Sequence, residues 1–386
     1  MRTPVIAVVC AVLGGLLALG IARATGVFDG AAAATTTVVE HDVARQSTTR
    51  AAAVPAGAFA PARIYRDRSP GVVTLFSYFG GTAAQGSGFV VDDRGTILTN
   101  AHVITNAGET TGKVSRASNV YVEFPDHDRV PATIVGWDVF DDVGVVRVDP
   151  RAHALTPLPL GRSASLVVGQ PVAAIGSPLG NLDSLAVGIV SAVHRSIAAL
   201  TADFALNDAI QTDAPIAHGS SGGPLLDAAG RVIGINAQIR TDQGASAGIG
   251  FAVPIDAARR SLRQLLTKGS VSYAYAGIQA EDLTPSLAAH LQLAAARGAL
   301  VDHVTAGGPA DRAGIRGGTK ETAFLGETHL AGGDVVVAFA GHPVTGADSL
   351  VRIVTSIEPG TRVPVVVVRG RARRTLHLTL ASRPGR

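Results

Sequence analysis

Short runs of β-branched and aliphatic residues recur along the middle of the 386-residue chain, and Gly, Asp and Pro separate them. Such runs suit strands, while the separating residues favour turns. Many short strands at close spacing are typical of an all-β barrel or sandwich, which we place at residues 63–268. The runs are Val72–Phe76, Gly88–Val91, Val120–Phe124, Val143–Val148, Val172–Ile175 and Arg231–Ile235. Helical spacing over Ile255–Leu266 predicts a closing helix.

A second unit, with mixed α/β character, is predicted at residues 273–384. It contains a helical segment at Pro285–Leu293 and an amphipathic stretch at Ser349–Ile357. Its length of roughly 110 residues fits a small binding domain. The basic segment Arg369–Arg374 runs directly into an alternating apolar pattern, so we interpret it as a solvated hairpin turn.

An apolar stretch, Val5–Ala22, lies near the start of the sequence with a basic residue on each side. Its eighteen residues are just enough to span a bilayer as a helix, so residues 1–25 are predicted to be a retained single-pass membrane anchor. A signal peptide cleaved near Ala24 is the alternative, which would give a secreted or periplasmic protein. In both cases the bulk of the chain is expected outside the cytoplasm, behind an Ala/Thr-rich linker at 26–62.

Charge and cysteine content argue against several functions. The formal net charge is only +3, and no long basic run with interleaved aromatic residues occurs, so nucleic-acid binding is not expected. Cys10 is the only cysteine, which excludes a disulfide framework and a thiolate metal site. His and carboxylate positions lack metal-ligand spacing, and no phosphate-binding glycine loop precedes a helix, so no metal or other cofactor is expected.

The segment Gly219–Pro224 reads GSSGGP and carries the strongest indication of chemistry. Glycines let the backbone turn tightly and leave amide N–H groups able to point into a cleft, as a nucleophilic serine with an oxyanion hole requires. By itself, such a segment is more typical of a surface turn. The catalytic interpretation therefore depends on finding a general base and an orienting carboxylate elsewhere.

Two upstream residues supply those roles. His102 directly follows one predicted strand, and Asp142 directly precedes another. The order His102, Asp142, Ser221 is that of the chymotrypsin-type double β-barrel and differs from the order in other serine hydrolase folds. Asp138 and Asp141 are near rivals of Asp142 for the role of the acid.

The same architecture indicates which serine is the nucleophile. There, the amide two residues before the nucleophile and the amide of the nucleophile itself form the oxyanion hole. Only Ser221 lies two residues beyond Gly219, so we predict an oxyanion loop of Gly219, Ser220 and Ser221 in which Ser220 contributes backbone geometry.

Several motifs resemble, in order, those of the HtrA/Deg family of trypsin-like serine proteases. They are Gly86–Val91, Leu98–Val103, Asp138–Val145, Ala174–Gly180, Gly188–Ser191, Gln211–Ala214, Gly219–Leu226 and Gly248–Pro254. The C-terminal unit resembles a PDZ domain, with Tyr275, Ala276, Gly277 and Ile278 in the place of the carboxylate-binding loop. The resemblance implies a mainly β fold, with a chymotrypsin-like double β-barrel followed by an α+β PDZ domain.

Roles for individual residues follow from this resemblance. His102 corresponds to the general base, Ser221 to the nucleophile and Asp142 to the orienting acid, because in the family the acid precedes an aliphatic–small–aliphatic strand. Ile216 and Ile239 correspond to positions that line the S1 pocket, which implies cleavage after small aliphatic residues. Neither position offers a charge that could pair with Lys or Arg at the cleavage site.

The implied function is that of an ATP-independent endopeptidase that degrades misfolded or exposed extracytoplasmic proteins by acyl-enzyme chemistry. The PDZ domain would bind C-terminal or exposed apolar peptides by strand addition. A non-proteolytic chaperone or PDZ adaptor on the same scaffold is the alternative, and the complete triad favours the protease. The short loop expected at residues 76–85 favours a homotrimer over larger cages.

Some features depart from the family pattern. Ser220 stands where relatives commonly have Asn, and it should be tolerated because it supplies backbone geometry. His218 stands where relatives commonly have Pro or Arg, and we interpret it as a loop residue, with an added pH dependence of activity as the alternative. Residues 317–333 are predicted to be an insertion between a helix and a strand of the PDZ domain. The peptide specificity of this domain therefore does not follow from the resemblance.

Overall fold

The computed structural model describes residues 59–107, 114–177, 184–198, 205–237 and 249–384. The predicted anchor or signal segment at residues 1–25 and nearly all of the linker at 26–62 lie outside this part of the chain. Ile239, one of the two predicted S1 residues, also lies outside it. Within the described residues, no helix has both the length and the apolar character needed to cross a membrane.

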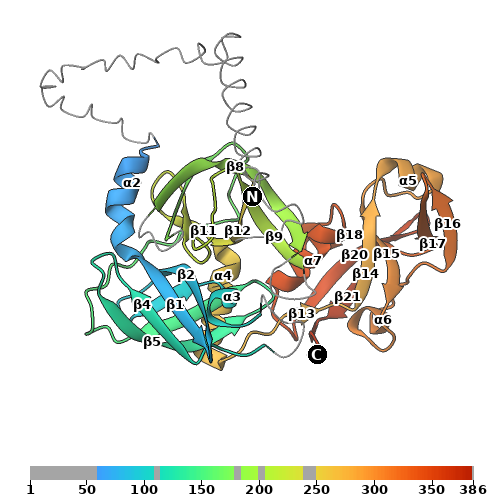
Figure 1. Cartoon of the computed structure of the whole chain (residues 1–386). Helices are drawn as coiled ribbons and strands as arrows, with labels where there is room; N and C mark the ends of the chain where they lie inside the picture. Colours follow the sequence, from blue (N-terminus) through green and yellow to red (C-terminus); the bar gives the residue numbers. More distant parts are fainter. Residues whose placement is uncertain (1–58, 108–113, 178–183, 199–204, 238–248, 385–386) are drawn as a thin grey trace, which may run out of the picture. The chain divides into compact units, whose positions relative to one another are not determined.

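Two closed barrels of six strands each make up the β-rich domain (Figure 1). The first barrel pairs its strands in the order β1-β2-β3-β6-β5-β4, and the second has the equivalent order β7-β8-β9-β12-β11-β10. The strands of the first are β1 (Val72–Phe79), β2 (Thr82–Val90), β3 (Thr96–Thr99), β4 (Asn119–Glu123), β5 (Arg129–Asp138) and β6 (Val143–Val148). Those of the second are β7 (Pro171–Gly176), β8 (Ser184–Ala198), β9 (Ala205–Thr212), β10 (Pro224–Leu226), β11 (Val232–Ala237) and β12 (Gly250–Pro254). The predicted double β-barrel is therefore confirmed.

Residues 76–85 differ from the loop that the sequence led us to expect. They belong mostly to β1 and β2, which pair continuously from Val72 opposite Phe89 to Phe79 opposite Thr82. The turn between the strands is reduced to Gly80 and Gly81, whose φ angles are 64° and 151°. Two glycines suit so tight a hairpin because its turn residues require positive φ.

Alternation of apolar and polar residues explains why the strands close into barrels. In β4, Val120 and Val122 are buried while Asn119 and Tyr121 are exposed, so one face meets the core and the other meets solvent. Burying each large apolar side chain stabilises the fold by roughly 1.5–3 kcal/mol. The largest fully buried side chains of the two barrels are Leu75, Phe89, Ile97, Leu98, Ile104, Phe124, Ile175, Ile210, Leu225, Leu226 and Ile233.

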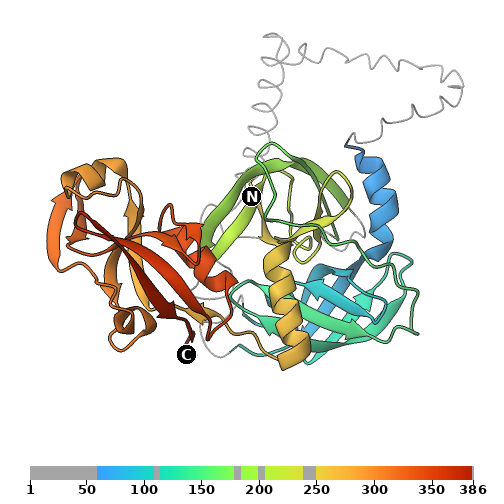
Figure 2. The same ribbon diagram turned by 180° about the vertical axis from the view of Figure 1, so that it is seen from behind.

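The predicted closing helix is confirmed as α4 (Ile255–Lys268), which lies across strands of both barrels (Figure 2). Its buried face includes Ile255, Ala258 and Leu265, which follow the helical period. The helix runs two residues beyond the predicted end because Gly269 caps it in the left-handed conformation. A further helix, α2 (Pro61–Arg68), precedes β1.

The C-terminal domain is built on a sheet with the order β14-β15-β18-β20-β21, and β19 pairs with β18. Its strands are β13 (Ala274–Tyr275), β14 (Ile278–Leu283), β15 (Gly298–Val304), β16 (Lys320–Phe324), β17 (Glu327–Ala331), β18 (Val335–Phe339), β19 (His342–Pro343), β20 (Arg362–Arg369), β21 (Ala372–Thr379) and β22 (Ala381–Ser382). Its helices are α5 (Pro285–His290), α6 (Pro309–Arg312) and α7 (Ala347–Ser356). The predicted basic hairpin turn joins β20 to β21, and the predicted insertion contains the separate hairpin β16–β17.

Candidate active site

His102 and Asp142 are brought together by strand pairing in the first barrel. His102 lies in the short helix α3 (Ala101–Ile104), which follows β3, and Asp142 is the residue directly before β6. Strand β3 pairs with β6 in a register that places Thr99 opposite Gly144. The residues that follow one strand and precede the other therefore meet at the same edge of the sheet.

Both oxygens of the Asp142 carboxylate contact His102. Oδ2 lies 2.8 Å from Nδ1 of the imidazole, and Oδ1 accepts a hydrogen bond from the backbone N–H of His102 at 3.1 Å. A carboxylate facing Nδ1 keeps a proton on that nitrogen and leaves Nε2 as the acceptor. This is the tautomer that a general base acting on a serine hydroxyl requires.

The electrostatics of the pair favour the charged imidazole. Burial of the ring acts to lower the pKa of His102, but the negative charge of Asp142 and its hydrogen bond outweigh burial, so the pKa is raised above 6.5. A raised pKa helps the ring hold a proton taken from a nucleophile.

The two rival carboxylates face other groups. Asp138 accepts hydrogen bonds from side chains of α4 and of the segment after it, and Asp141 lies 3.2 Å from the guanidinium of Arg260. Of the three acids considered from the sequence, the structure thus brings Asp142 to His102 and directs Asp138 and Asp141 elsewhere.

Ser221 lies on the second barrel, in the loop between β9 and β10, and Ser87 of β2 holds this loop from the first barrel. The Ser87 backbone N–H donates to the Ser221 carbonyl at 2.7 Å, and the Ser87 hydroxyl donates to the Gly219 carbonyl at 2.6 Å. The same hydroxyl accepts the backbone N–H of Ser177 at 2.9 Å. One buried serine therefore connects the first barrel to both ends of the predicted oxyanion loop.

Two glycines of this loop have conformations that other residues rarely adopt. Gly219 has a φ of 91° and Gly222 a φ of 90°. A Cβ atom on Gly222 would also lie 2.0 Å from the carbonyl oxygen of Ser87, a separation that no packing tolerates. The glycines of the GSSGGP segment thus serve both the turn and the close approach of the two barrels.

Ser220 makes a different contribution from its neighbours in the predicted oxyanion loop. Its backbone N–H donates to the Ala217 carbonyl at 3.0 Å, so this amide is not directed toward a substrate. This contact agrees with the role in backbone geometry that we predicted for Ser220 from the sequence. Gly219 and Ser221 remain the candidate oxyanion donors, and Ser220 holds the turn that separates them.

The predicted S1 residues are placed only in part. Ile216 is half-buried and adjoins Gly250, where an added Cβ would come within 2.9 Å of the Ile216 Cδ1 atom. His218 is exposed. In the described ranges, no group of three or more His, Cys, Asp or Glu residues is arranged to hold a metal ion.

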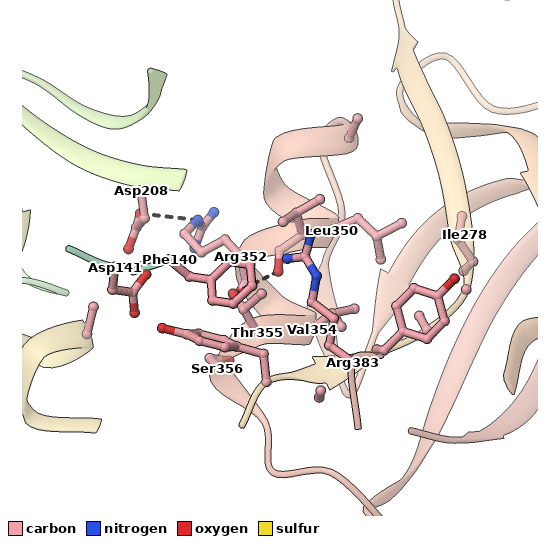
Figure 3. Close-up of a pocket in the computed structure, with 18 of the residues that line it drawn as sticks. Phe140, Asp141, Asp208, Ile278, Leu350, Arg352, Val354, Thr355, Ser356 and Arg383 are labelled. Atoms are coloured by element: carbon pink, nitrogen blue, oxygen red, sulfur yellow. Dashed lines mark hydrogen bonds and ion pairs between the residues drawn. The ribbon is translucent and has the colours of Figure 1, made fainter. Parts of the chain in front are cut away.

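A pocket of about 390 Å³ adjoins the predicted peptide-binding residues of the C-terminal domain (Figure 3). Tyr275, Ala276, Gly277 and Ile278 line it together with α7, which contributes Leu350 and Val354 among others. Arg352 of α7 lies 3.5 Å from Asp208, as the dashed line in Figure 3 marks. The β-rich domain also lines this pocket, through Phe140, Asp141, Asp208, Ala257 and Arg260, so its wall is partly charged. Strand β14 is the last strand in the described sheet order.

Comparison with known proteins assigns both domains. A family model for the trypsin-like peptidase domain matches residues 86–235, and a PDZ domain model matches residues 274–380. HhoA from Synechocystis sp. is 37% identical over 307 residues, which cover 78% of this chain and 71% of HhoA. The solved structure of the HtrA-type protease AlgW with a tripeptide has a TM-score of 0.68 and 30% identity, and covers 85% of this chain and 98% of AlgW. This chain belongs to the HtrA family of trypsin-like serine proteases.

Other relatives of this HtrA protease are longer. The chloroplastic protease Do-like 1 of Arabidopsis thaliana is 36% identical over 299 residues, which make up 64% of its length. A DegP-like periplasmic serine endoprotease of Pseudomonas fluorescens is 35% identical over 299 residues, or 56% of its length. The chain thus spans from 56% to 71% of the length of these relatives.

Some residues that hold the site of this HtrA protease could not be predicted from its sequence. Ser87 and Ser177 lie in segments that resemble the family, yet nothing in those segments gave either serine a role. Ser87 and Gly219 are 132 positions apart in the sequence, so only the closed barrels reveal that they meet.

Proposed function

We propose that this HtrA protease is an endopeptidase with Ser221 as nucleophile, His102 as general base and Asp142 as the acid that orients His102. The observation that carries the proposal is the contact of both Asp142 oxygens with His102, one with Nδ1 and one with the backbone N–H. The left-handed glycines on each side of Ser221 also support it, since they give the loop the tight turn that a nucleophilic serine needs.

The proposed reaction has two halves. Nε2 of His102 takes the hydroxyl proton of Ser221 as the serine oxygen attacks the scissile carbonyl carbon, and the amides of Gly219 and Ser221 stabilise the oxyanion. The imidazolium then gives its proton to the leaving amine, the C–N bond breaks, and an acyl-enzyme remains. A water molecule deprotonated by His102 attacks the ester, and Ser221 regains its proton as the acid product leaves.

We propose that the substrates are misfolded or exposed extracytoplasmic proteins, cleaved without ATP after small aliphatic residues. The apolar side chain of Ile216 supports this preference, as does the lack of a charge at Ile239. Selectivity among aliphatic residues should be shallow, because one methylene in an apolar pocket changes binding by about 1–3 kcal/mol.

The PDZ domain is proposed to bind C-terminal or exposed apolar peptides. A peptide would add as a strand along the edge of β14, with its carboxylate at Tyr275–Ile278 and its apolar side chain against Leu350. The shared pocket of Tyr275–Ile278 and the apolar residues Leu350 and Val354 supports this role, and the relative AlgW has been solved with a tripeptide and with a decapeptide.

Digestion of unfolded casein by the purified full chain tests the proposed protease. The wild type and Ser220→Ala should degrade casein and react with a fluorophosphonate probe, because Ser220 contributes only backbone geometry. Ser221→Ala should do neither. Equal digestion by Ser221→Ala would refute the assignment. An inert wild type that still prevents casein aggregation would instead identify the non-proteolytic chaperone.

We further propose a homotrimer at the cell membrane, with the catalytic domain outside the cytoplasm. Relatives named as periplasmic endoproteases support the extracytoplasmic location. The short β1–β2 turn supports the small assembly, because it provides no long arm toward further subunits. Mass photometry of the detergent-solubilised chain should give three times the 39.2 kDa chain mass after correction for detergent.

A further inference from the structure

The carboxylate of Asp138 is buried and accepts four hydrogen bonds. Asp138 is only 3% exposed. Its Oδ1 accepts the backbone N–H of Phe140 at 3.0 Å and that of Asp141 at 3.5 Å. Its Oδ2 accepts the hydroxyl of Ser261 at 2.6 Å and also the hydroxyl of Tyr273. Both oxygens are therefore committed, one to the turn that follows β5 and the other to α4 and the segment after it.

That turn ends at the acid of the triad. Asp138 is the last residue of β5, and residues 139–142 connect it to β6. Asp142 adopts a φ of 49°, a left-handed conformation that costs a residue other than glycine on the order of 1 kcal/mol or more. Such a conformation persists only where the surroundings impose it. The two amides held by Asp138 fix the turn from one side, and the Asn100 side chain donates to the Asp142 carbonyl at 2.9 Å from the other.

We propose that Asp138 is a positioning residue for the reaction, which holds the turn so that the Asp142 carboxylate faces His102. The hydroxyl groups of Ser261 and Tyr273 hold the Asp138 carboxylate through hydrogen bonds. This inference rests on the proposed roles of His102 and Asp142. It assigns to the chemistry a buried carboxylate that the triad mechanism does not use.

A purely structural role accounts less well for a charged group at this place. Burying a carboxylate costs several kcal/mol, and a well-packed apolar residue would often stabilise the fold as much. An apolar side chain could not hold two successive amides of the turn. Burial first and the charge of Asp138 second raise the pKa of the neighbouring Asp141 to about 7, and Arg260 opposes this rise only in part. The presence of a carboxylate at position 138 is thus explained by the conformation that it imposes on the turn at residues 139–142.

Tyr273 connects Asp138 to the segment that follows the barrels. It lies between α4 and β13, the first strand of the PDZ domain. Its hydroxyl bonds to Asp138, and its ring meets the ring of Phe140 edge to face, with 5.3 Å between centroids. Tyr273 therefore holds the carboxylate of Asp138 and packs against the middle of the turn.

Three variants of the full chain test the inference. Tyr273→Phe and Ser261→Ala each remove one outer donor without changing charge, and Asp138→Asn changes the central group. We expect kcat per fluorophosphonate-labelled site to fall about tenfold or more in Asp138→Asn, with KM within about twofold, because small misplacements of catalytic groups cost rate and not binding. Tyr273→Phe and Ser261→Ala should show the same change to a smaller extent.

The pKa of His102, followed by NMR titration of its imidazole, is the second readout and needs no turnover. It should fall in all three variants, because a displaced Asp142 stabilises the imidazolium less. The matched control is Asp227→Asn, since buried Asp227 also holds a turn through two backbone amides, those of Ala229 and Arg231, both at 2.9 Å. This control should lower thermal stability and leave both readouts unchanged.

The outcomes separate the inference from the proposed function. If the wild type is active and Asp142→Asn is not, the triad stands. Wild-type kcat per labelled site and an unchanged His102 pKa in Tyr273→Phe and Asp138→Asn would then overturn the positioning role alone. If the wild type does not turn over, the proposed function fails, and the His102 titration still decides whether Asp138 positions Asp142.

Discussion

One oxygen of the Asp142 carboxylate contacts the His102 ring and the other contacts the His102 backbone, so Asp142 can hold both parts of this residue. One oxygen orients the ring through Nδ1, and the other holds the backbone that carries the ring. A rotation of the carboxylate would therefore disturb both the tautomer of His102 and the placement of its Cα atom. A replacement with the same shape but different hydrogen-bonding capacity separates these two effects.

Asp142→Asn is such a replacement. If its remaining oxygen keeps the backbone N–H, its amide group must face Nδ1, and the ring proton then moves to Nε2, where it blocks general-base action. We expect kcat to fall by about ten-thousandfold with little change in thermal stability. Kinetics on a peptide substrate with active sites counted by titration would measure this fall. The exposed Asp149→Asn should retain full activity, and an Asp142→Asn enzyme within tenfold of the wild type would contradict the expectation.

The pH dependence of the wild type has a defined sign. His102 must be neutral to accept the proton of Ser221, and its pKa is raised above 6.5 by Asp142 against the effect of burial. Activity should therefore rise with pH through a midpoint above 6.5 and be lost below it. The pH profile of kcat/KM reports this midpoint in the free enzyme. A midpoint below 6.5 would show that Asp142 does not stabilise the imidazolium.

Ser87→Ala tests the connection between the barrels. The change leaves the Gly219 carbonyl and the Ser177 N–H without their buried partner, at a cost of about 1–3 kcal/mol. We expect lower thermal stability and a loss of kcat of at least tenfold, because Gly219 carries a proposed oxyanion donor. Ser118→Ala removes an exposed hydroxyl bonded to the Tyr78 carbonyl and should alter neither property. Unchanged kcat in Ser87→Ala would show that the loop keeps its shape without this bond.

At this scale the sequence pointed to the proposed triad but not to the groups that hold it. Residue type, order and the glycines around Ser221 pointed to His102 and Asp142. Ser87 gave no signal, and Asp138 was considered only as a rival acid, because the roles of both depend on backbone amides and carbonyls that any residue carries. Only the folded chain determines which of these groups they reach.

At the scale of the secondary-structure elements, a cluster of titratable residues joins the inserted hairpin β16–β17 to the sheet of the PDZ domain. Buried His329 of β17 has Nδ1 2.8 Å from Oε2 of Glu281 on β14. Asp302 of β15 lies close by, and burial first and the charge of Glu281 second raise its pKa to about 6. Within the described residues, neither Oε1 of Glu281 nor Oδ1 of Asp302 has a hydrogen-bond partner.

The raised pKa of Asp302 makes the stability of the PDZ domain depend on pH. The unfolded chain releases this proton near pH 3.8 and the folded domain near pH 6, so stability falls as pH rises through that window. Asp302→Asn should therefore raise the free energy of unfolding at pH 7 by about 1 kcal/mol once solvent screening is allowed for, and by nothing near pH 3.5. Calorimetry of the full chain at both pH values measures this difference. Glu321→Gln on the exposed side of the hairpin is the matched control, and a gain that persists at pH 3.5 would contradict the assignment to Asp302.

Strands and helices with a clear periodicity of apolar residues could be predicted from the sequence. Hairpins that depend on one tight turn were harder to predict. Alternation in the strands and the spacing over α4 gave the right structure, because burial of one face dominates their energy. The hairpins at Gly80–Gly81 and in the insertion were read as a loop and as an undefined segment. Their formation depends on strand pairing and on the His329 contact, and neither leaves a clear period in the sequence.

For the molecule as a whole, the site exists only where the two barrels meet. The first barrel supplies His102, Asp142 and the Ser87 hydroxyl, and the second supplies the loop of Ser221. Helix α4 packs against both, and Arg68 of α2 reaches the carbonyl of Gly230 at 2.8 Å. Helix α2 is thus tied to the second barrel.

Whether the whole protein is attached to the membrane should depend on the proposed anchor at residues 1–25. As a helix, the eighteen residues Val5–Ala22 would extend about 27 Å, close to the roughly 30 Å of a bilayer core. An Arg at the centre of such a span disfavours membrane insertion by about 3 kcal/mol. The double variant Leu16→Arg with Leu17→Arg should therefore lose membrane insertion. The control with Leu16→Ile and Leu17→Ile should keep it. Carbonate extraction of membranes from expressing cells, with the intact mass of the product, measures both retention and cleavage. A wild-type chain that resists extraction with residues 1–25 intact supports the anchor, and a soluble product that begins at Thr25 shows that the segment is a cleaved signal instead.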